Sequence, residues 1–290
     1  MSNKQEGLLQ LTGSTQKMIF FRKKNGEFGL KRKGGVTSER FRNDPNFEQV
    51  RLNTQDFAKA GKAGKLIKRA FGTITPKQAN STLFPRLTKA CKAVIKSDLE
   101  HERGQRTLLE GDTNLLVNFN FTEAGNFDSI WLVPISHSID RVAGTVGISL
   151  PAFIPAEMVV SPDKATHVKL RMGAAAIDFE TGEHAFSEAG ASEIVLGKTT
   201  TGPVELSAQI PQGTTDPVFI AIVIEFMEQE GNIMYPILNS RFLLMKMVAV
   251  DVPDCSNTTL FSESAKHWNV PHGYCRRNFR IAGRASTGRY

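Results

Sequence analysis

The chain has few of the residues that build disulfide frameworks, membrane spans and secretion signals. It holds three cysteines, two tryptophans and three tyrosines in 290 residues, and an odd number of cysteines gives no disulfide framework. Its longest apolar run, Val218 to Met227, is interrupted by Glu225 and reaches about half of the roughly 20 residues that a membrane span needs. The first 20 residues lack the apolar core and cleavage site of a secretory signal. We therefore expect synthesis in the cytoplasm without such a signal, and no membrane partner.

Catalytic and cofactor motifs are also missing. There is no G-x-S-x-G elbow, H-E-x-x-H pair, EF-hand loop or dinucleotide-binding glycine pattern. The stretch GKAGK at 61–65 resembles a phosphate-binding loop, but two residues separate its glycines where four are required. Leu66 stands where that loop needs a hydroxyl. We expect no enzyme, no cofactor and no small-molecule substrate.

One group of residue types near the C-terminus suggests a metal site. Its members are Cys255, His267, His272 and Cys275. The spacing lacks the paired Cys-x2–4-Cys knuckle that makes zinc assignments specific. We expect no bound metal, and instead expect Trp268 and Tyr274 to pack this tail against the rest of the chain.

Charge is distributed unevenly along the chain. The composition, 40% hydrophobic and 22% charged, is that of a globular protein. Residues 1–110 hold 23 lysines and arginines against 10 acidic residues, whereas residues 111–250 hold 7 against 16. Residues 251–290 are basic again, with 6 against 3. Such a separation bears on partners and association and not on fold.

The strongest local pattern is a hairpin within residues 17–33. Asn25-Gly26 lies between two strand-like runs and is the preferred pair for a two-residue type I′ turn, with positive φ at both positions. That turn predicts Lys24 opposite Glu27. It also predicts an apolar face made of Ile19, Phe21, Phe28 and Leu30, with Arg22, Lys24 and Lys31 on the other face. An isolated hairpin is marginal in water, so this apolar face needs a cover, from this chain or a neighbouring copy.

Two helices are expected after the hairpin. Asp44-Pro45 is a good helix start, and the periodicity continues to about Phe71. A second helix is expected from about Arg86 to Leu99. Gly61 and Gly64 each weaken the first helix by about 1 kcal/mol relative to alanine. We expect them to permit close approach of another backbone.

From residue 114 the pattern changes to short strands separated by turn residues. The expected strands are Leu115–Phe121, Ile130–Ile135, Thr145–Leu150, His167–Met172, Val204–Ile210, Val218–Met227, Ile233–Leu238 and Phe242–Val250. Such a series without helical patterns indicates an antiparallel β-sandwich of Ig-like or jelly-roll type. The expected class is therefore α+β, mostly β. Its expected parts are a basic hairpin and helix module at 1–110, an acidic sandwich at 111–252 and a basic extended tail at 253–290.

The basic module also carries a resemblance. The run from Gly13-Ser14 through Asn25-Gly26 and 31–35, then Asp44-Pro45 and 60–65, resembles a family of uncharacterised Bacteroidetes proteins, as does PDKATH at 162–167. The resemblance implies host range and a shared layout of hairpin, basic helix and β-sandwich. It brings no catalytic or binding residues.

Two functions fit the charge pattern, beside simple attraction between the two segments within one monomer. The first is structural: the basic module docks on a neighbouring copy and builds a homo-oligomer such as a filament, a ring or a virion-type subunit. The second is non-specific nucleic-acid binding through phosphate contacts, with phenylalanines stacking on bases. The candidate residues for either are Phe21, Lys23, Lys24, Phe28, Lys31, Arg32, Lys33, Lys59, Gly61, Lys62, Gly64 and Lys65.

Overall fold

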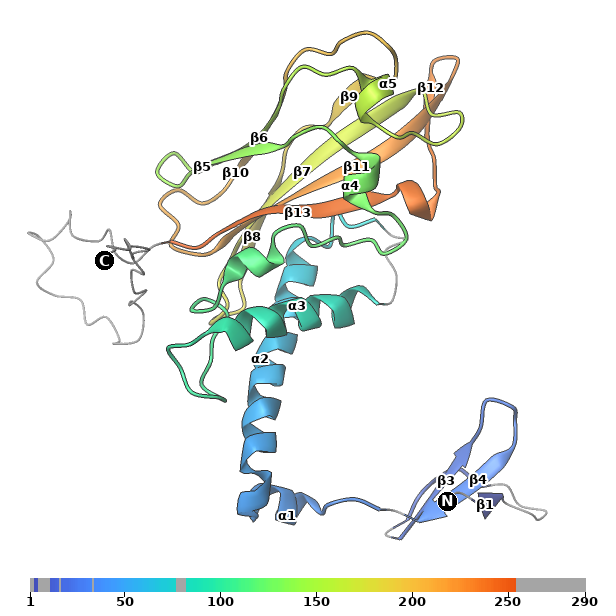
Figure 1. Ribbon diagram of the computed structural model, residues 1–290, viewed down its shortest axis with the longest axis vertical. Helices are drawn as coiled ribbons and strands as arrows, with labels where there is room; N and C mark the ends of the chain where they lie inside the picture. Colours follow the sequence, from blue (N-terminus) through green and yellow to red (C-terminus); the bar gives the residue numbers. More distant parts are fainter. Residues whose placement is uncertain (1–2, 5–10, 16, 33, 77–81, 254–290) are drawn as a thin grey trace, which may run out of the picture. The chain divides into compact units, whose positions relative to one another are not determined.

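A computed structural model describes residues 3–4, 11–15, 17–32, 34–76 and 82–253 (Figure 1). The chain divides into two compact units, residues 1–52 and residues 53–290. The first holds a small antiparallel sheet, and the second holds helices and further antiparallel sheets, so the α+β class is confirmed. The division falls inside a helix, away from residue 110, where the charge pattern changes sign.

The first unit is built around a four-stranded antiparallel sheet, which we call the N-terminal sheet. Its strands are β1 (Asn3–Lys4), β2 (Gly13–Ser14), β3 (Met18–Arg22) and β4 (Phe28–Arg32), in the order β1-β4-β3-β2. A short helix α1 (Ser38–Asn43) and a 3-10 turn η1 (Pro45–Phe47) lead into α2 (Glu48–Ala70). The Asp44 side chain accepts a hydrogen bond from the Asn46 backbone at 3.0 Å, which confirms the expected Asp-Pro start.

The hairpin exists, but its predicted turn is wrong. The Lys23 amide donates to the Glu27 carbonyl at 2.8 Å and the Gly26 amide donates to the Lys23 carbonyl at 3.0 Å. Gly26 has φ +87°, while Asn25 is not in the left-handed region. This is a three-residue loop, a type I turn followed by one left-handed glycine. It requires positive φ only at the glycine, which removes the cost of a left-handed asparagine.

The longer loop shifts the register by one residue, so the predicted faces are also wrong. Arg22 now pairs with Phe28 and Phe20 with Leu30, which places them on one face. Ile19, Phe21 and Lys31 share the opposite face. A one-residue shift exchanges the faces of one strand relative to its partner. Apolar and cationic side chains therefore occur on both faces of the N-terminal sheet.

Replacing Gly26 with valine should destabilise this hairpin. A β-branched residue at φ +87° is expected to cost about 1–2 kcal/mol, which corresponds to a roughly tenfold loss of amide protection in β3 and β4. Hydrogen exchange read by mass spectrometry measures this directly. Gly34→Val is the control, since Gly34 has open space and no positive φ. Equal protection in the Gly26 variant and the wild type would refute the turn assignment.

The second unit contains the rest of α2 and all later elements. They are α3 (Leu83–Ser97), η2 (Thr113–Leu116), α4 (Phe127–Ile130), β5 (Ser136–Asp140), β6 (Thr145–Leu150), α5 (Pro155–Met158), β7 (His167–Ile177), β8 (His184–Glu188), β9 (Ser192–Val195), β10 (Val204–Gln209), β11 (Val218–Glu230), β12 (Ile233–Pro236), η3 (Ser240–Phe242) and β13 (Leu244–Asp251). No helix in the described ranges is both long enough and apolar enough to cross a membrane.

Two sheets form this unit. In the larger one β7 and β11 are central; β8 and β9 follow one another along the outer edge of β7, and β13 and β12 do so along the outer edge of β11. The smaller sheet has the order β10-β6-β5. All pairings are antiparallel, as expected.

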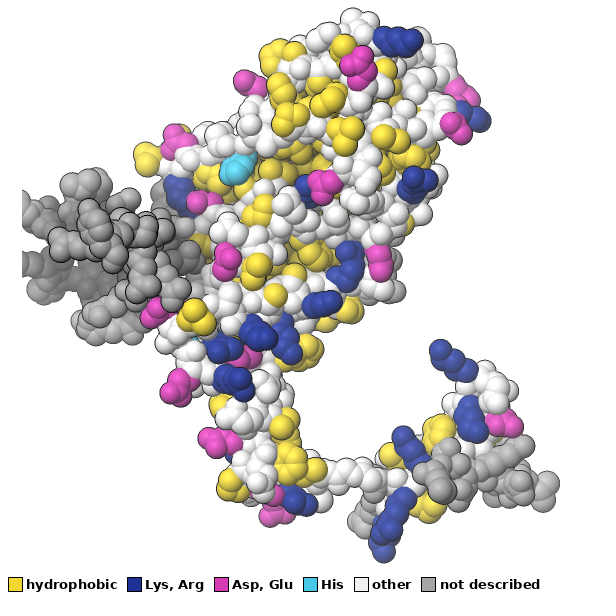
Figure 2. All heavy atoms as spheres, viewed as in Figure 1, with side chains coloured by type: hydrophobic (Ala, Val, Ile, Leu, Met, Phe, Trp, Pro, Cys, Tyr) yellow, Lys and Arg dark blue, Asp and Glu magenta, His cyan; other side chains and the backbone are white. Residues whose placement is uncertain are grey.

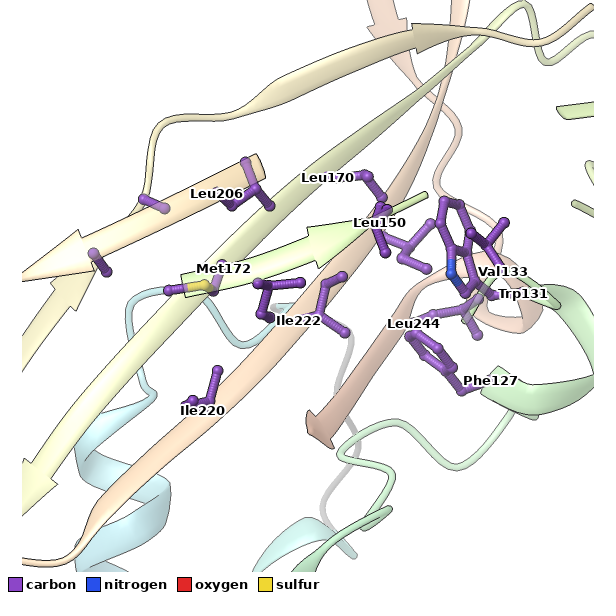
Figure 3. Packing of buried hydrophobic residues seen from close by; sticks show 14 of the residues in the cluster. Phe127, Trp131, Val133, Leu150, Leu170, Met172, Leu206, Ile220, Ile222 and Leu244 are labelled. Carbon is purple, nitrogen blue, oxygen red and sulfur yellow. The ribbon is translucent and has the colours of Figure 1, made fainter. Parts of the chain in front are cut away.

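The centre of the large sheet, in β11 and the second half of β7, is buried on both faces. Ile220 and Ile222 point into a core shared with the small sheet, together with Trp131 and Leu206 (Figure 3). Their neighbours point the opposite way, into a second core with α2 and α3, as Phe219 does. Burial on two faces explains why β11 reads as a nearly continuous apolar run, whereas the first half of β7 alternates, with His167, Lys169 and Arg171 only half-buried.

Two expected strands are not found as such. The range Leu115–Phe121 begins inside η2, and only its end follows β13, with the Phe121 amide donating to the Met245 carbonyl at 2.8 Å. The range Ile130–Ile135 begins at the end of α4, and Trp131 forms only an isolated bridge to Val159. Asp112 and Asn126 cap these two turns, which is why local helix replaces strand there. The other six expected strands overlap β6, β7, β10, β11, β12 and β13.

Candidate functional site

The candidate residues fall on two units. Phe21, Lys23, Lys24, Phe28, Lys31 and Arg32 belong to the N-terminal sheet and its turn, whereas Lys59, Gly61, Lys62, Gly64 and Lys65 belong to α2 in the second unit. Lys33 lies outside the described residues, as do the four C-terminal metal-ligand candidates and the aromatic residues of the tail.

The N-terminal sheet has no core of its own. Gly29 is the one fully buried residue among the described residues of 1–52. The apolar side chains of β3 and β4 are only partly buried: Met18, Ile19, Phe20, Phe21, Phe28 and Leu30. The first buried apolar side chain in chain order is Ala60, in the second unit. The first unit therefore presents apolar surface on both faces of a thin sheet.

Cations lie over the aromatic rings of this sheet. The Arg22 guanidinium is 5.6 Å from the Phe28 ring centroid, and the Lys31 ammonium is 5.6 Å from the Phe21 ring centroid on the other face. The Phe21 ring also covers Gly29, where a Cβ would come within 2.9 Å of a ring carbon. Figure 2 shows the resulting mixture of Lys, Arg and hydrophobic side chains on the sheet. These contacts hold the rings against the sheet and leave the cations exposed at its surface.

The remaining candidates in this unit have simpler surroundings. Lys23 forms a 3.2 Å ion pair with Glu27 across the turn, so its charge is partly neutralised. Lys24 and Arg32 are exposed. In the segment that follows the sheet in the chain, Arg51 donates to the Phe41 and Asp44 carbonyls at 2.9 Å each and fixes α1 against the start of α2.

The two α2 glycines behave differently. A Cβ at Gly64 would lie 3.2 Å from the Thr88 backbone nitrogen, so the expected close backbone approach is confirmed there, and α3 of the same unit makes it. Gly61 has no described atom within 4 Å of such a Cβ. Of the two glycines, Gly61 therefore has no packing role within the described structure.

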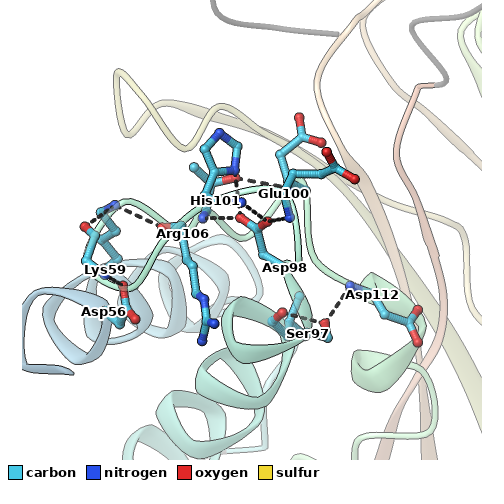
Figure 4. A network of polar contacts seen from close by, with 12 residues as sticks. Asp56, Lys59, Ser97, Asp98, Glu100, His101, Arg106 and Asp112 are labelled. Atoms are coloured by element: carbon cyan, nitrogen blue, oxygen red, sulfur yellow. Dashed lines mark hydrogen bonds and ion pairs between the residues drawn. The ribbon is translucent and has the colours of Figure 1, made fainter. Parts of the chain in front are cut away.

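Lys59 has a structural role. Its ammonium donates to the Gly104 and Arg106 carbonyls at 2.9 Å each, and so helps to fix the segment 98–112 against α2 (Figure 4). Asp56, one turn earlier and buried, accepts a hydrogen bond from the Gly104 amide at 2.9 Å. Lys62 and Lys65 are exposed.

Asp98 is the centre of this polar network, and the sequence analysis missed it. It has 0% exposure, and its carboxylate accepts backbone hydrogen bonds from Glu100, His101 and Thr107 at 3.0–3.1 Å and lies 3.0 Å from the His101 ring Nδ1. Burial is the largest single influence and acts to raise its pKa, but the hydrogen bonds from Thr107, His101 and Glu100 together outweigh it and hold the pKa below its ordinary value. The available signal was an Asp at the end of the expected helix, a position that favours an Asx turn.

Histidine, cysteine and acidic side chains are candidate metal ligands, and a cysteine is also a candidate nucleophile. The described part of the chain contains no group of three or more His, Cys, Asp or Glu side chains that could hold a metal ion. Cys91 is buried in the core between α3 and the large sheet, and burial raises the pKa of its thiol to about 12. That thiol is protonated near neutral pH and is a poor nucleophile.

The positive charge of α3 is a second feature that sequence reasoning missed as a candidate site. Helix α3 carries Arg86, Lys89, Lys92 and Lys96 and no acidic residue, and this imbalance could be read directly from its fifteen residues. Arg86 is occupied, because it donates to the Asn120 and Phe121 carbonyls at 2.7 and 2.6 Å. The three lysines are exposed. Comparison with known proteins adds no further assignment, since no protein-family model and no curated protein matches the chain.

Proposed function

We propose that this protein is a structural subunit that self-associates through its N-terminal sheet, which docks on a neighbouring copy. The observation that carries the proposal is the absence of any buried apolar side chain among the described residues of 1–52. A small sheet is marginally stable in water unless one face is covered. Association would supply that cover.

The size of the driving force fits reversible assembly. Completing the burial of each partly buried Phe, Leu or Ile is worth about 0.5–1 kcal/mol, a fraction of the value for full burial. These five side chains and Met18 therefore contribute a few kcal/mol, against an association cost of at least about 4 kcal/mol. The surface needs electrostatic help and more than one contact per copy. We therefore expect assembly that depends on protein concentration and salt.

The arrangement of charge supplies such help. Arg22, Lys24, Lys31 and Arg32 surround the apolar side chains, and residues 111–250 carry the acidic excess. Opposite charges on docking surfaces raise the association rate and select the partner. Contact between two different surfaces of identical subunits produces rings or open filaments. Apolar side chains on both sheet faces would allow one copy to contact two neighbours.

The remaining parts of the proposal concern the second unit. Its two facing sheets share one core, which supports a β-sandwich, and an Ig-like or jelly-roll character belongs to the same proposal. In this role the sandwich is a scaffold, and the chain needs no catalytic site.

Sedimentation velocity across a concentration series tests the proposal. Ile19→Ser/Phe21→Ser alters one sheet face and Phe20→Ser/Leu30→Ser the other; each is expected to stop assembly at small oligomers, since one face remains. Leu99→Ser/Val142→Ser is the control, because these side chains are 82% and 87% exposed in the second unit. Phe20→Leu/Phe21→Leu keeps the apolar surface and should still assemble.

The effects of salt and of added nucleic acid distinguish self-association from nucleic-acid binding. Raising salt should weaken the assembly in part, because exposed charges are screened over about 10 Å at 0.1 M. A wild type that stays monomeric at high concentration and low salt would contradict self-association. A different result is that this monomer binds DNA with an affinity that falls steeply with salt. If Lys24→Gln/Arg32→Gln then abolishes this binding, the N-terminal sheet is a nucleic-acid-binding element.

A further inference from the structure

Three lysines form one exposed line on α3. Lys89, Lys92 and Lys96 are spaced by three and four residues, which places them on the same side of the helix over about 10 Å. We call this line the lysine ridge. Figure 2 shows Lys and Arg side chains gathered over α3.

The ridge is not neutralised by the described residues of the chain. None of its lysines forms an ion pair there, and Asp98, the acid nearest in sequence, is buried and accepts backbone amides. Four cations elsewhere in the second unit do form ion pairs with carboxylates at 2.5–3.7 Å, namely Arg141, Lys169, Arg171 and Lys246. Like charges at these helical spacings each destabilise the helix by a few tenths of a kcal/mol. An anionic partner would remove this repulsion.

An exposed aromatic ring adjoins the middle of the ridge. The Lys92 ammonium lies 5.5 Å from the centroid of the Phe57 ring, which extends from α2 and is 53% exposed. The contact of Gly64 with Thr88 fixes the crossing of the two helices that brings this ring to Lys92. Ring and lysines are therefore held in place by packing in the second unit.

We propose that the lysine ridge and Phe57 bind single-stranded nucleic acid, with phosphates on the lysines and a base on the ring. A line of unpaired cations follows a phosphate backbone without regard to sequence. An exposed ring beside it supplies the stacking surface that single-stranded nucleic acids use. This surface lies in the second unit, and it does not depend on the N-terminal sheet or on assembly.

Fluorescence anisotropy with a labelled single-stranded oligonucleotide tests the proposal on the full chain. Lys89→Gln/Lys96→Gln removes two exposed charges and leaves the contact of Lys92 with Phe57. We expect at least fivefold weaker binding at low salt and a slope of log affinity against log salt that is smaller by about 1.4. Phe57→Leu should weaken binding severalfold without changing that slope.

Lys164→Gln/Lys198→Gln is the matched control, because these lysines are exposed in the acidic part of the chain. It should bind like the wild type. Three results would overturn the proposal: no binding by the wild type at low salt, unchanged binding by Lys89→Gln/Lys96→Gln, or an equal loss in the control. A fourth is loss of assembly in Lys89→Gln/Lys96→Gln without nucleic acid, which would make the ridge a contact between copies. Sedimentation without oligonucleotide reports on self-association separately, so the two proposals can fail independently.

Discussion

Replacing Gly111 with alanine should destabilise the second unit by about 3 kcal/mol, at the upper end of overpacking substitutions. A Cβ at this position would lie 2.1 Å from the Val94 carbonyl oxygen and 2.8 Å from its carbon. Both are backbone atoms of α3, so the clash cannot be relieved by a side-chain rotation. The segment that follows Asp98 would have to move away from the helix.

Urea denaturation measures this effect as a shift of the unfolding midpoint. Gly202→Ala is the control, since the added Cβ would meet open space. A Gly111→Ala protein that unfolds together with the wild type would show that α3 and this segment do not pack as described.

Replacing Asp98 with asparagine should cost a comparable amount. The Glu100 and His101 amides now donate to one carboxylate oxygen and the Thr107 amide to the other, so an asparagine would turn its NH₂ group toward the backbone amides on one of these two sides. A buried donor left without an acceptor costs about 1–3 kcal/mol, so we expect a loss of about 3 kcal/mol near neutral pH. Asp163→Asn, at an exposed turn, should have little effect.

The Asp98 contribution should also depend on pH. Because the folded protein holds the pKa of Asp98 below its ordinary value of 3.8, the ionised carboxylate stabilises the fold at pH values above that value. The contribution is lost as pH falls through the lowered pKa. The difference in unfolding free energy between wild type and Asp98→Asn should therefore be constant from pH 5 to 7 and shrink under more acidic conditions, as measured by urea denaturation at each pH. A difference that stays constant into strong acid would refute this role.

The large elements could be predicted from the sequence because their signals are local. Asp44-Pro45 marks the start of a helix, an apolar run marks β11, and alternation of polar and apolar residues marks the first half of β7. The hairpin register could not be derived in this way. Asn25-Gly26 fits both a two-residue type I′ turn and a three-residue loop. The first requires positive φ at Asn25, whereas the second avoids that cost and adds one residue to the loop.

The candidate site was harder to predict because some of its residues are already engaged in packing or hydrogen bonds within the fold. Lys59 and Gly64 looked available in the sequence, but Lys59 holds the 98–112 segment and Gly64 contacts α3. Asp98 was not singled out from the sequence and is fully buried. Burial decides the role of Asp98, and contacts distant in sequence decide those of Lys59 and Gly64; composition and spacing contain neither.

The central claim is that another copy covers the N-terminal sheet, and hydrogen exchange of β3 and β4 across a protein concentration series tests it most directly. We predict that amide protection in residues 18–22 and 28–32 rises with concentration, while protection in β7 and β11 stays constant. Protection in β3 and β4 that is the same at every concentration, with the protein monomeric throughout, would contradict self-association through this sheet.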